Sequence, residues 1–180
     1  HYPLRRQRQM CKETEQTLGA DAPPPCYEDI DHAQLIFIVG SNTAYAHPII
    51  YRRIEDARKA NPLLKVIVAD PRRTDTAREA DLFLPILPGT DVALFNGMLH
   101  ICLWEDLVDL DYKLRNDGFA ELKQTVRDYT PKFVAEICGI KEEDLMQAAR
   151  MFGKSPASLS MYCHCLLYTS PSPRDATLSR

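Results

Sequence analysis

Two predominantly apolar runs on either side of a helix-period stretch constrain the fold of this chain most strongly. Leu35–Val39 is Leu-Ile-Phe-Ile-Val and Lys65–Ala69 is Lys-Val-Ile-Val-Ala, and a turn-forming residue follows each run. Such continuous runs are typical of strands that are buried on both faces of a parallel sheet. Between them, Pro48–Ala60 carries apolar residues at helical spacing. Strand, helix and strand in this order predict a right-handed βαβ unit.

The pattern continues more loosely after the second strand. Arg73–Ala80 is polar and has room for a short helix, and Leu82–Leu87 is predicted as a third strand. Pro85 places this strand at an edge of the sheet or at a bulge, because proline has no N–H group for the strand ladder. Asp91 is predicted to cap a helix over Val92–Trp104.

The remaining segments complete an α/β pattern. Three further helices are predicted near Gly118–Tyr129, Pro131–Cys138 and Glu142–Phe152, with Gly153 as the C-cap of the last, and Ala157–Tyr162 begins another strand. The fold class that follows is α/β: an open, mainly parallel sheet with flanking helices, in the manner of a truncated Rossmann-like dinucleotide-binding domain.

Composition limits the classes of partner. The 180 residues are 45% hydrophobic and 26% charged, as in an ordinary globular domain, and no apolar run is long enough to predict a membrane span. A net charge of −3 argues against a nucleic-acid partner. We therefore expect a cytoplasmic protein with neither a membrane nor a nucleic-acid partner. Four cysteines are isolated in sequence and predicted to be buried structural thiols: Cys26, Cys102, Cys138 and Cys163.

Both ends of the chain resemble translated sequencing-adapter DNA. Arg5–Cys11 and Cys165–Asp175 are similar to the two partner adapters of a transposon library, one at each end. We therefore expect three segments: an adapter-derived segment over 1–15, the native domain over 16–163, and a second adapter-derived segment over 164–180. On this interpretation the basic N-terminal arm says nothing about nucleic acid, and the two end segments pack poorly against the domain.

Polar loops follow each of the three predicted strands. They are Gly40-Ser-Asn-Thr43, Asp70-Pro-Arg-Arg73 and Pro88-Gly-Thr-Asp91. Parallel strands would open all three at the carboxyl edge of the sheet, where ligands of such folds bind. The loops offer small residues for close backbone approach, hydroxyl groups, an arginine for phosphate and carboxylates for a base or ribose. The helix start after Asn42 would suit a pyrophosphate. The pattern indicates a dinucleotide cradle without the usual glycine fingerprint.

Each of these residues also has a purely structural explanation. Gly40 can serve only to make a turn, Asn42 only to cap a helix, and Asp70 only to bond its own turn. Arg72 and Arg73 can be a solvated pair. His47 is expected as a capping or packed histidine, and Trp104 and Tyr112 as cover for the core. No Ser/His/Asp set, carboxylate pair or ligand cluster stands out, so neither catalytic residues nor metal ligands are predicted.

Four motifs in order resemble one enzyme superfamily. Phe37–Thr43, Val68–Thr74, Ala77–Asp81 and Pro88–Leu94 are together similar to the molybdopterin oxidoreductases of the dimethyl-sulfoxide-reductase type. Within that superfamily, Gln16–Cys26 and Ser41–Pro48 most resemble the catalytic subunit of prokaryotic assimilatory nitrate reductase. The resemblance covers essentially all of residues 16–163.

This resemblance implies a function for the cradle. The family's cofactor is a bis(molybdopterin guanine dinucleotide) molybdenum centre with a 4Fe-4S cluster, and the nitrate reductases convert nitrate to nitrite with electrons from a donor protein or subunit. The resemblance implies that Gly40, Ser41 and Asn42 approach a pyrophosphate, that Asp70 and Arg72 hold the nucleotide end, and that Gly89, Thr90 and Asp91 close over it. The predicted cofactor-binding set is Gly40, Ser41, Asn42, Thr43, Asp70, Pro71, Arg72, Gly89, Thr90 and Asp91.

The family's cysteine ligands to molybdenum and to the cluster would lie upstream of Gln16. We therefore expect an internal fragment that is inactive alone. Two other functions stay open. One is a different member of the superfamily, such as a formate dehydrogenase, because the cradle is shared while the substrate pocket is built elsewhere. The other is a free-standing nucleotide-binding or interaction domain with no redox role.

Overall fold

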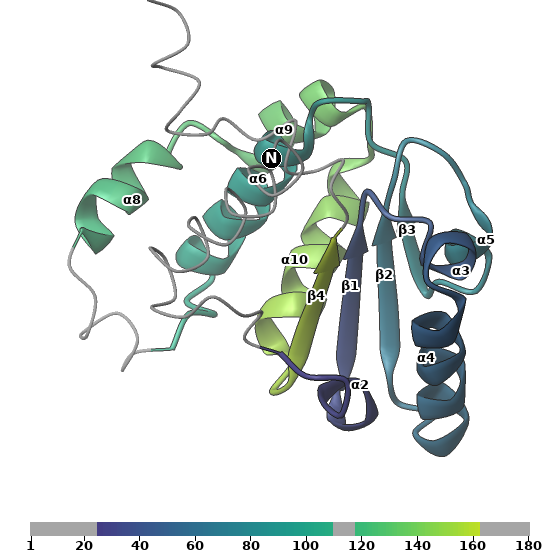
Figure 1. The fold of residues 1–180 in the computed structure, drawn as a ribbon. Helices are drawn as coiled ribbons and strands as arrows, with labels where there is room; N and C mark the ends of the chain where they lie inside the picture. Colours follow the sequence, from purple (N-terminus) through teal and green to yellow (C-terminus); the bar gives the residue numbers. More distant parts are fainter. Residues whose placement is uncertain (1–24, 110–117, 163–180) are drawn as a thin grey trace, which may run out of the picture.

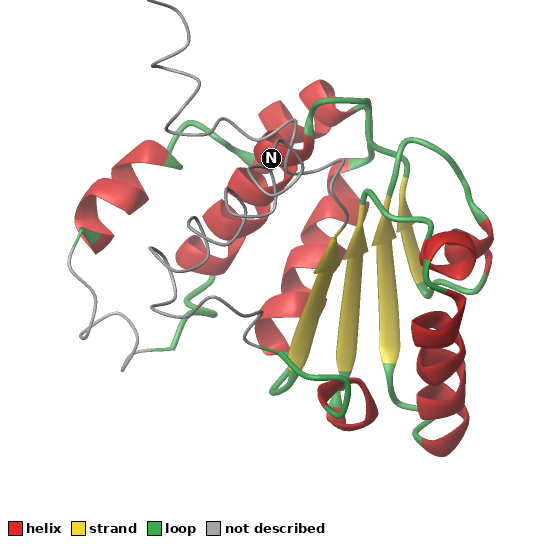
Figure 2. Cartoon of the chain, in the orientation of Figure 1, coloured by secondary structure: helices red, strands yellow, loops and turns green. Residues whose placement is uncertain are grey.

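In the part of the chain that the structure describes, helices cover both faces of a four-stranded parallel sheet, as the sequence predicts (Figure 2). This computed structural model describes residues 25–109 and 118–162. The strands are β1 (Leu35–Val39), β2 (Lys65–Ala69), β3 (Leu82–Leu84) and β4 (Ser158–Tyr162). They lie in the order β3-β2-β1-β4, and every neighbouring pair is parallel.

The helices divide between the two faces of the sheet (Figure 1). One face packs against α2 (Asp29–His32) and α4 (Pro48–Ala60), and the other against α6 (Asp91–Trp104), α9 (Pro131–Cys138) and α10 (Glu142–Lys154). The short helices α3 (Thr43–Ala46) and α5 (Asp75–Arg78) contact each other beside β2 and β3, and α8 (Phe119–Thr125) lies beyond α6.

The alternation of side chains along β1 explains why its sequence is continuously apolar. Leu35, Phe37 and Val39 belong to the core shared with α6, α9 and α10. Ile36 and Ile38 belong to the core shared with α2 and α4. All five side chains are at most 2% exposed, since each face is covered by helices.

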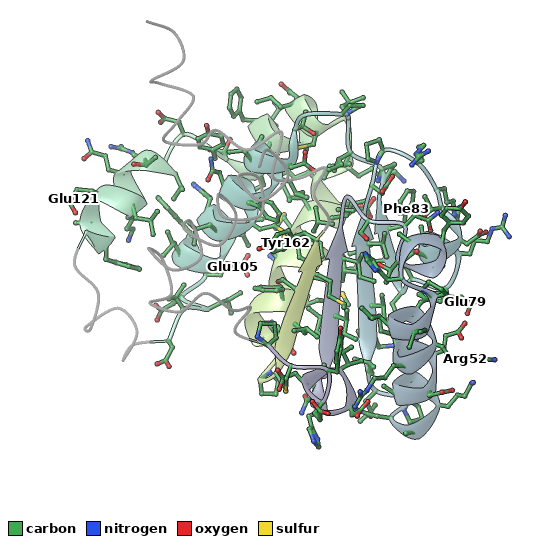
Figure 3. All side chains as sticks on the ribbon, viewed as in Figure 1. Arg52, Glu79, Phe83, Glu105, Glu121 and Tyr162 are labelled. Atoms are coloured by element: carbon green, nitrogen blue, oxygen red, sulfur yellow. The ribbon has the colours of Figure 1, made fainter. Side chains whose placement is uncertain are left out.

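Helix α4 has the amphipathic character that its spacing predicts. Ile54 and Ala57 are buried against the sheet, and Ile50 packs against the same core. Arg52 is exposed and points away from the sheet (Figure 3). The helix begins at Pro48, which needs no N–H partner in the first turn, and ends at Ala60 before Asn61-Pro62.

Three local predictions are wrong. Strand β3 ends at Leu84, three residues before the predicted end, because Pro85 cannot donate to the ladder. Gly153 lies inside α10 rather than at its C-cap, and a Cβ there would meet Leu107 at 3.0 Å. Asp91 is the first residue of α6 rather than its cap, which is Thr90.

Several predictions lie outside the described residues. These are the adapter-derived segments 1–15 and 164–180, the thiol of Cys163 and the side chain of Tyr112. Within the part of the chain that the structure describes, no helix has the length and apolar character needed to cross a membrane.

Candidate functional site

Strand register brings the three predicted loops to one edge of the sheet. Val39 is paired with Ala69, and Ala69 with Leu84, so the three strands end side by side. Backbone bonds continue this alignment for one more residue: Gly40 N donates to Ala69 O at 2.9 Å, and Asp70 N to Leu84 O at 3.2 Å. The predicted common direction of the three strands is therefore confirmed, and Figure 1 shows their carboxyl ends together.

The first loop combines an open backbone with buried hydroxyl groups. Gly40 has a φ of +57°, and a Cβ added there would find no atom within 4 Å. The side chains of Ser41 and Thr43 are 6% and 3% exposed, and their hydroxyl oxygens lie 3.2 Å apart. The glycine fits a left-handed turn that most residues avoid, and it leaves its outer side clear for a ligand.

Asn42 holds the N-cap position of α3, but its side chain makes no capping bond. Instead, its Oδ1 accepts a hydrogen bond of 3.0 Å from the Thr76 hydroxyl in α5. Thr76 Oγ1 in turn accepts a 3.0 Å bond from Ala44 N. Helix α3 is a single turn, and the Ala44 N–H is already engaged. This N–H group is thus not available to a pyrophosphate, and an anion there would depend on the preceding residues of the loop.

The second loop holds a buried carboxylate beside exposed cations. Asp70 is 6% exposed, and its Oδ1 accepts from Arg72 N at 2.8 Å. Asp70 therefore makes the hydrogen bond within its own turn that a purely structural role would explain. Its carboxylate is also buried, which costs free energy and which the turn alone does not require. Pro71, Arg72 and Arg73 are exposed, and the Arg73 guanidinium lies 5.9 Å from the centre of the Phe83 ring.

The Thr74 hydroxyl in this loop is buried and has no hydrogen-bond partner. Thr74 is the N-cap residue of α5, yet its side chain does not accept from the helix. A buried hydroxyl without a partner costs free energy, about 1–3 kcal/mol. It is therefore the kind of group that a bound polar ligand would satisfy.

The third loop is fixed by α9 rather than by the other two loops. Leu87 N donates to Cys138 O at 2.9 Å, and the Cys138 thiol donates to Thr90 O at 3.6 Å. Thr90 Oγ1 closes the turn on Leu87 O at 2.7 Å, and Gly89 has a φ of +82° with open space around it. Asp91 is 8% exposed at the start of α6.

Burial keeps the cysteine beneath this loop in its neutral form. Desolvation raises the pKa of the Cys138 thiol above its usual 9.0. The bond to Thr90 lowers the pKa by less than this, and the charge of Asp91 adds a still smaller increase. Burial likewise raises the pKa of Cys102. A raised pKa disfavours the reactive thiolate form. The burial of Cys138 agrees with its prediction as a buried structural thiol, whereas Cys102 is only half-buried.

Other sequence predictions need correction. Cys26 is exposed in the turn before α2, where its N–H donates to Asp29 Oδ2. His47 is exposed and makes no side-chain cap, because its backbone alone provides the junction between α3 and α4. Trp104 is 47% exposed and stacks on the His100 ring at 4.0 Å, so it covers the end of α6 only in part.

Two hollows are lined by residues outside the three loops, although Thr76, which bonds Asn42, lines one of them. One of about 420 Å³ is on the outer side of α10, and another of about 300 Å³ lies between α4 and α5. None of the ten predicted site residues lines either hollow, so the candidate site is the open edge of the sheet. Among residues 25–109 and 118–162, no three His, Cys, Asp or Glu side chains gather as metal ligands.

Sequence reasoning missed three groups that lie beneath this edge. Thr76, Thr74 and Cys138 lie under the loops, but none was chosen as a site residue. The signal for the two threonines was present, since both follow Asp70-Pro-Arg-Arg within one helical turn. Nothing in the sequence indicates that Cys138, 47 residues after Asp91, bonds the third loop.

The sequence matches the molybdopterin oxidoreductase family over residues 5–149, most of the chain, and the protein belongs to this family. A parallel α/β sheet with flanking helices is consistent with this membership.

Individual relatives carry different activities. The chain is 42% identical over 149 residues to the alpha subunit of an F420-dependent formate dehydrogenase from Methanococcus maripaludis, covering 82% of this chain and 22% of that protein. It is 42% identical over 157 residues to a nitrate reductase from Symbiobacterium thermophilum, covering 82% and 21%. Acetylene hydratase from Pelobacter acetylenicus is a structural neighbour, with a TM-score of 0.66 and 33% identity over 74% of this chain and 18% of that one. The chain spans about a fifth of the length of these relatives.

Proposed function

We propose that this chain contributes the binding loops for one guanine dinucleotide arm of a bis(molybdopterin guanine dinucleotide) molybdenum centre. The observation that carries the proposal is the common edge: three parallel strands end in register, and each following loop supplies a buried polar side chain. These side chains are Ser41, Asp70 and Asp91, all less than 9% exposed. Burying a polar group costs free energy unless it is hydrogen-bonded, and ligands of open parallel sheets bind beyond the carboxyl ends of the strands.

The residues present fit such a nucleotide. Gly40 and Gly89 combine left-handed backbone with empty space where a side chain would stand, which admits a phosphate close to the backbone. Arg72 is exposed next to the buried Asp70, so one loop can offer a cation to phosphate and a carboxylate to a base or ribose. The unpartnered Thr74 hydroxyl gives a further donor and acceptor beside them.

When bound, a molybdenum–pterin centre supplies the oxidation and reduction chemistry of the enzyme. The part of this chain would be to bind and orient the nucleotide arm and to place its charged phosphates against fixed donors. Among the residues described there is no cluster that would ligate the metal itself. We propose that those ligands and the 4Fe-4S cluster belong to other parts of the full-length enzyme, so that residues 16–163 alone would be inactive.

The enzyme that we propose is a cytoplasmic nitrate reductase, reducing nitrate to nitrite with electrons from a donor protein or subunit. Relatives named nitrate reductase at 42% and 40% identity support this. A formate dehydrogenase is the second candidate, because relatives with that name match at 42% and 41%. We expect the three nucleotide-binding loops in both kinds of enzyme, so these loops do not distinguish nitrate from formate as the substrate.

Binding can be tested on the 180-residue chain with GDP as a probe of the nucleotide end. We expect GDP to shift the backbone amide signals of the three loops in ¹⁵N–¹H spectra, with a weak affinity because this chain would hold one arm only. ADP differs from GDP in its base, so it tests recognition of the base. Inorganic pyrophosphate has neither base nor ribose, so it tests binding through the phosphates alone. An equal response to GDP, ADP and pyrophosphate would contradict nucleotide recognition, and no response would contradict the site.

The substrate is tested on the full-length enzyme, once the coding sequence that surrounds residues 16–163 is recovered. We expect nitrite to form from nitrate with a reduced viologen dye. Oxidation of formate with oxidised dye, and no nitrite from nitrate, would replace the first candidate by the second. A complete reading frame beginning near Gln16 would favour a free-standing nucleotide-binding domain and overturn both.

A further inference from the structure

Thr76 joins two of the loops at the candidate edge although it belongs to neither. It lies in α5, the one-turn helix after the second loop, and its side chain is 1% exposed. Its hydroxyl lies 3.0 Å from Asn42 Oδ1 and 3.0 Å from Ala44 N, and both partners belong to the segment after β1. A single buried hydroxyl therefore bonds the segment after β1 to the helix that follows the loop after β2.

The direction of these bonds fixes the orientation of the Asn42 amide. Ala44 N–H can only donate, so the Thr76 oxygen accepts from it. The single Thr76 O–H proton must then find an acceptor, since a buried hydroxyl proton without one would cost free energy. Asn42 Oδ1 supplies that acceptor. With Oδ1 engaged, Nδ2 of Asn42 is the end of the amide that can donate to another group.

We propose that Thr76 is a positioning residue for nucleotide binding: its hydroxyl orients Asn42 and ties Ala44, so that the Asn42 amide presents donors to the phosphates. This inference rests on the proposed function. It assigns to α5 a task that does not involve contact with the ligand, because Thr76 is 1% exposed and its hydroxyl is occupied by two partners of the chain itself. Binding would then depend on a group outside all three loops.

The test uses Thr76→Val in the 180-residue chain, because valine keeps the shape and removes the hydroxyl. We expect GDP affinity to fall about fivefold, the size of one hydrogen bond to a ligand. Thr76→Ser restores the hydroxyl and is expected to restore most of the affinity. Thr125→Val is the matched control: Thr125 lies in α8, and its hydroxyl also bonds one backbone group, Glu121 O.

A double-mutant cycle separates positioning from general destabilisation. If Thr76 acts through Asn42, then Thr76→Val should change GDP affinity little in a chain that already carries Asn42→Ala. A further fivefold loss in that background would overturn the inference. So would a Thr76→Val chain that binds GDP as the unsubstituted chain does, or a serine variant that binds as weakly as the valine variant.

A ligand-free readout distinguishes this inference from the proposed function. In ¹⁵N–¹H spectra, Thr76→Val should shift the Ala44 backbone amide and the Asn42 side-chain amide, and Thr125→Val should leave both unchanged. If these signals move but the unsubstituted chain shows no GDP response, the proposed function fails and the positioning of Asn42 stands without a ligand. If they do not move in Thr76→Val, the inference fails whatever GDP does.

Discussion

The carboxyl and amino edges of the same sheet differ in how far their polar side chains are buried. At the carboxyl edge, polar side chains are buried; they are Ser41, Thr43, Asp70, Thr76 and Asp91. The first four of them bond to backbone or hydroxyl groups of the chain. At the amino edge, charged side chains remain accessible and form ion pairs. Asp81, before β3, contacts Lys65 at 3.0 Å and Arg58 at 3.1 Å, and Asp31 of α2 pairs with Arg53 of α4.

This difference distinguishes a ligand site from a scaffold. Exposed ion pairs contribute little to the free energy of folding, so the ion pairs at the amino edge need no ligand to explain them. Buried polar groups are expensive unless each finds a partner, and at the carboxyl edge Thr74 still has none. We therefore expect substitutions at the carboxyl edge to change nucleotide affinity more than stability, and substitutions at the amino edge to do the reverse.

The largest effect is expected from Asp70→Ala. Removing a buried carboxylate that accepts hydrogen bonds from a nucleotide should lower GDP affinity by roughly ten- to a hundredfold, as for other charged hydrogen-bond partners. Asp70→Asn is the control, because its amide oxygen can still accept from Arg72 N–H and keep the turn. Titration calorimetry measures both. An affinity for GDP that survives Asp70→Ala would show that the buried carboxylate has no part in binding.

At the amino edge, Asp81→Ala should destabilise the fold and leave GDP affinity unchanged. Asp81 Oδ2 accepts from Val66 N at 2.9 Å, and the substitution leaves that N–H group without its acceptor. We expect a loss of about 1–2 kcal/mol in the free energy of unfolding. Urea denaturation gives the value, and Asp56→Ala, which breaks only an exposed pair with Lys59, is the control. A parallel loss of GDP affinity would contradict the separation of the two edges.

The same carboxylate predicts a pH dependence. Burial raises the pKa of Asp81, but the bonds from Val66 N–H and Lys65 and the charge of Arg58 outweigh it, so the pKa lies below its usual 3.8. A lowered pKa in the folded state means that its contribution is present above about pH 3.8 and is lost as pH falls below that value. Urea midpoints measured between pH 5 and 3 should therefore fall less steeply in Asp81→Asn than in the unsubstituted chain. Equal slopes would refute the contribution.

The smallest effect is expected from Asp31→Asn. The hydrogen bond from Arg53 lowers the pKa of the Asp31 carboxyl, but both side chains are substantially exposed, so solvent screens the pair. The thermal midpoint should change within experimental error, and neither GDP affinity nor its salt dependence should change. A clear loss of stability would show that the amino edge depends on its exposed pairs after all.

The sequence predicted most of the sheet because burial on two faces leaves an unambiguous pattern. The bounds of β1, α4, β2 and α9 agree with the predicted ranges, since each is a continuous apolar run or an amphipathic stretch between turn residues. Where two local signals compete, the prediction was wrong. Apolar character continues to Leu87, but Pro85 ends β3 sooner, and the signal of Gly153 as a helix end yields to its close packing on Leu107.

The candidate site was predictable only as a set of loops. The residues after each strand follow from the rule for parallel sheets. The contacts that hold these loops do not follow from that rule. Thr76 bonds Asn42, 34 residues away in sequence, and Cys138 bonds Thr90, 48 residues away. Sequence spacing carries no information on such contacts. The buried positions of Ser41, Asp70 and Asp91, which separate this edge from the other, likewise emerge only from packing.

The most direct test of the central claim is a map of GDP-induced amide shifts over the 180-residue chain. We expect shifts confined to Gly40–Thr43, Asp70–Arg72 and Gly89–Asp91, with smaller ones in α5 around Thr76, and none at Asp81 or Asp31. Shifts at the amino edge, or at the hollow on α10 lined by Met146 and Arg150, without shifts in the three loops, would contradict it.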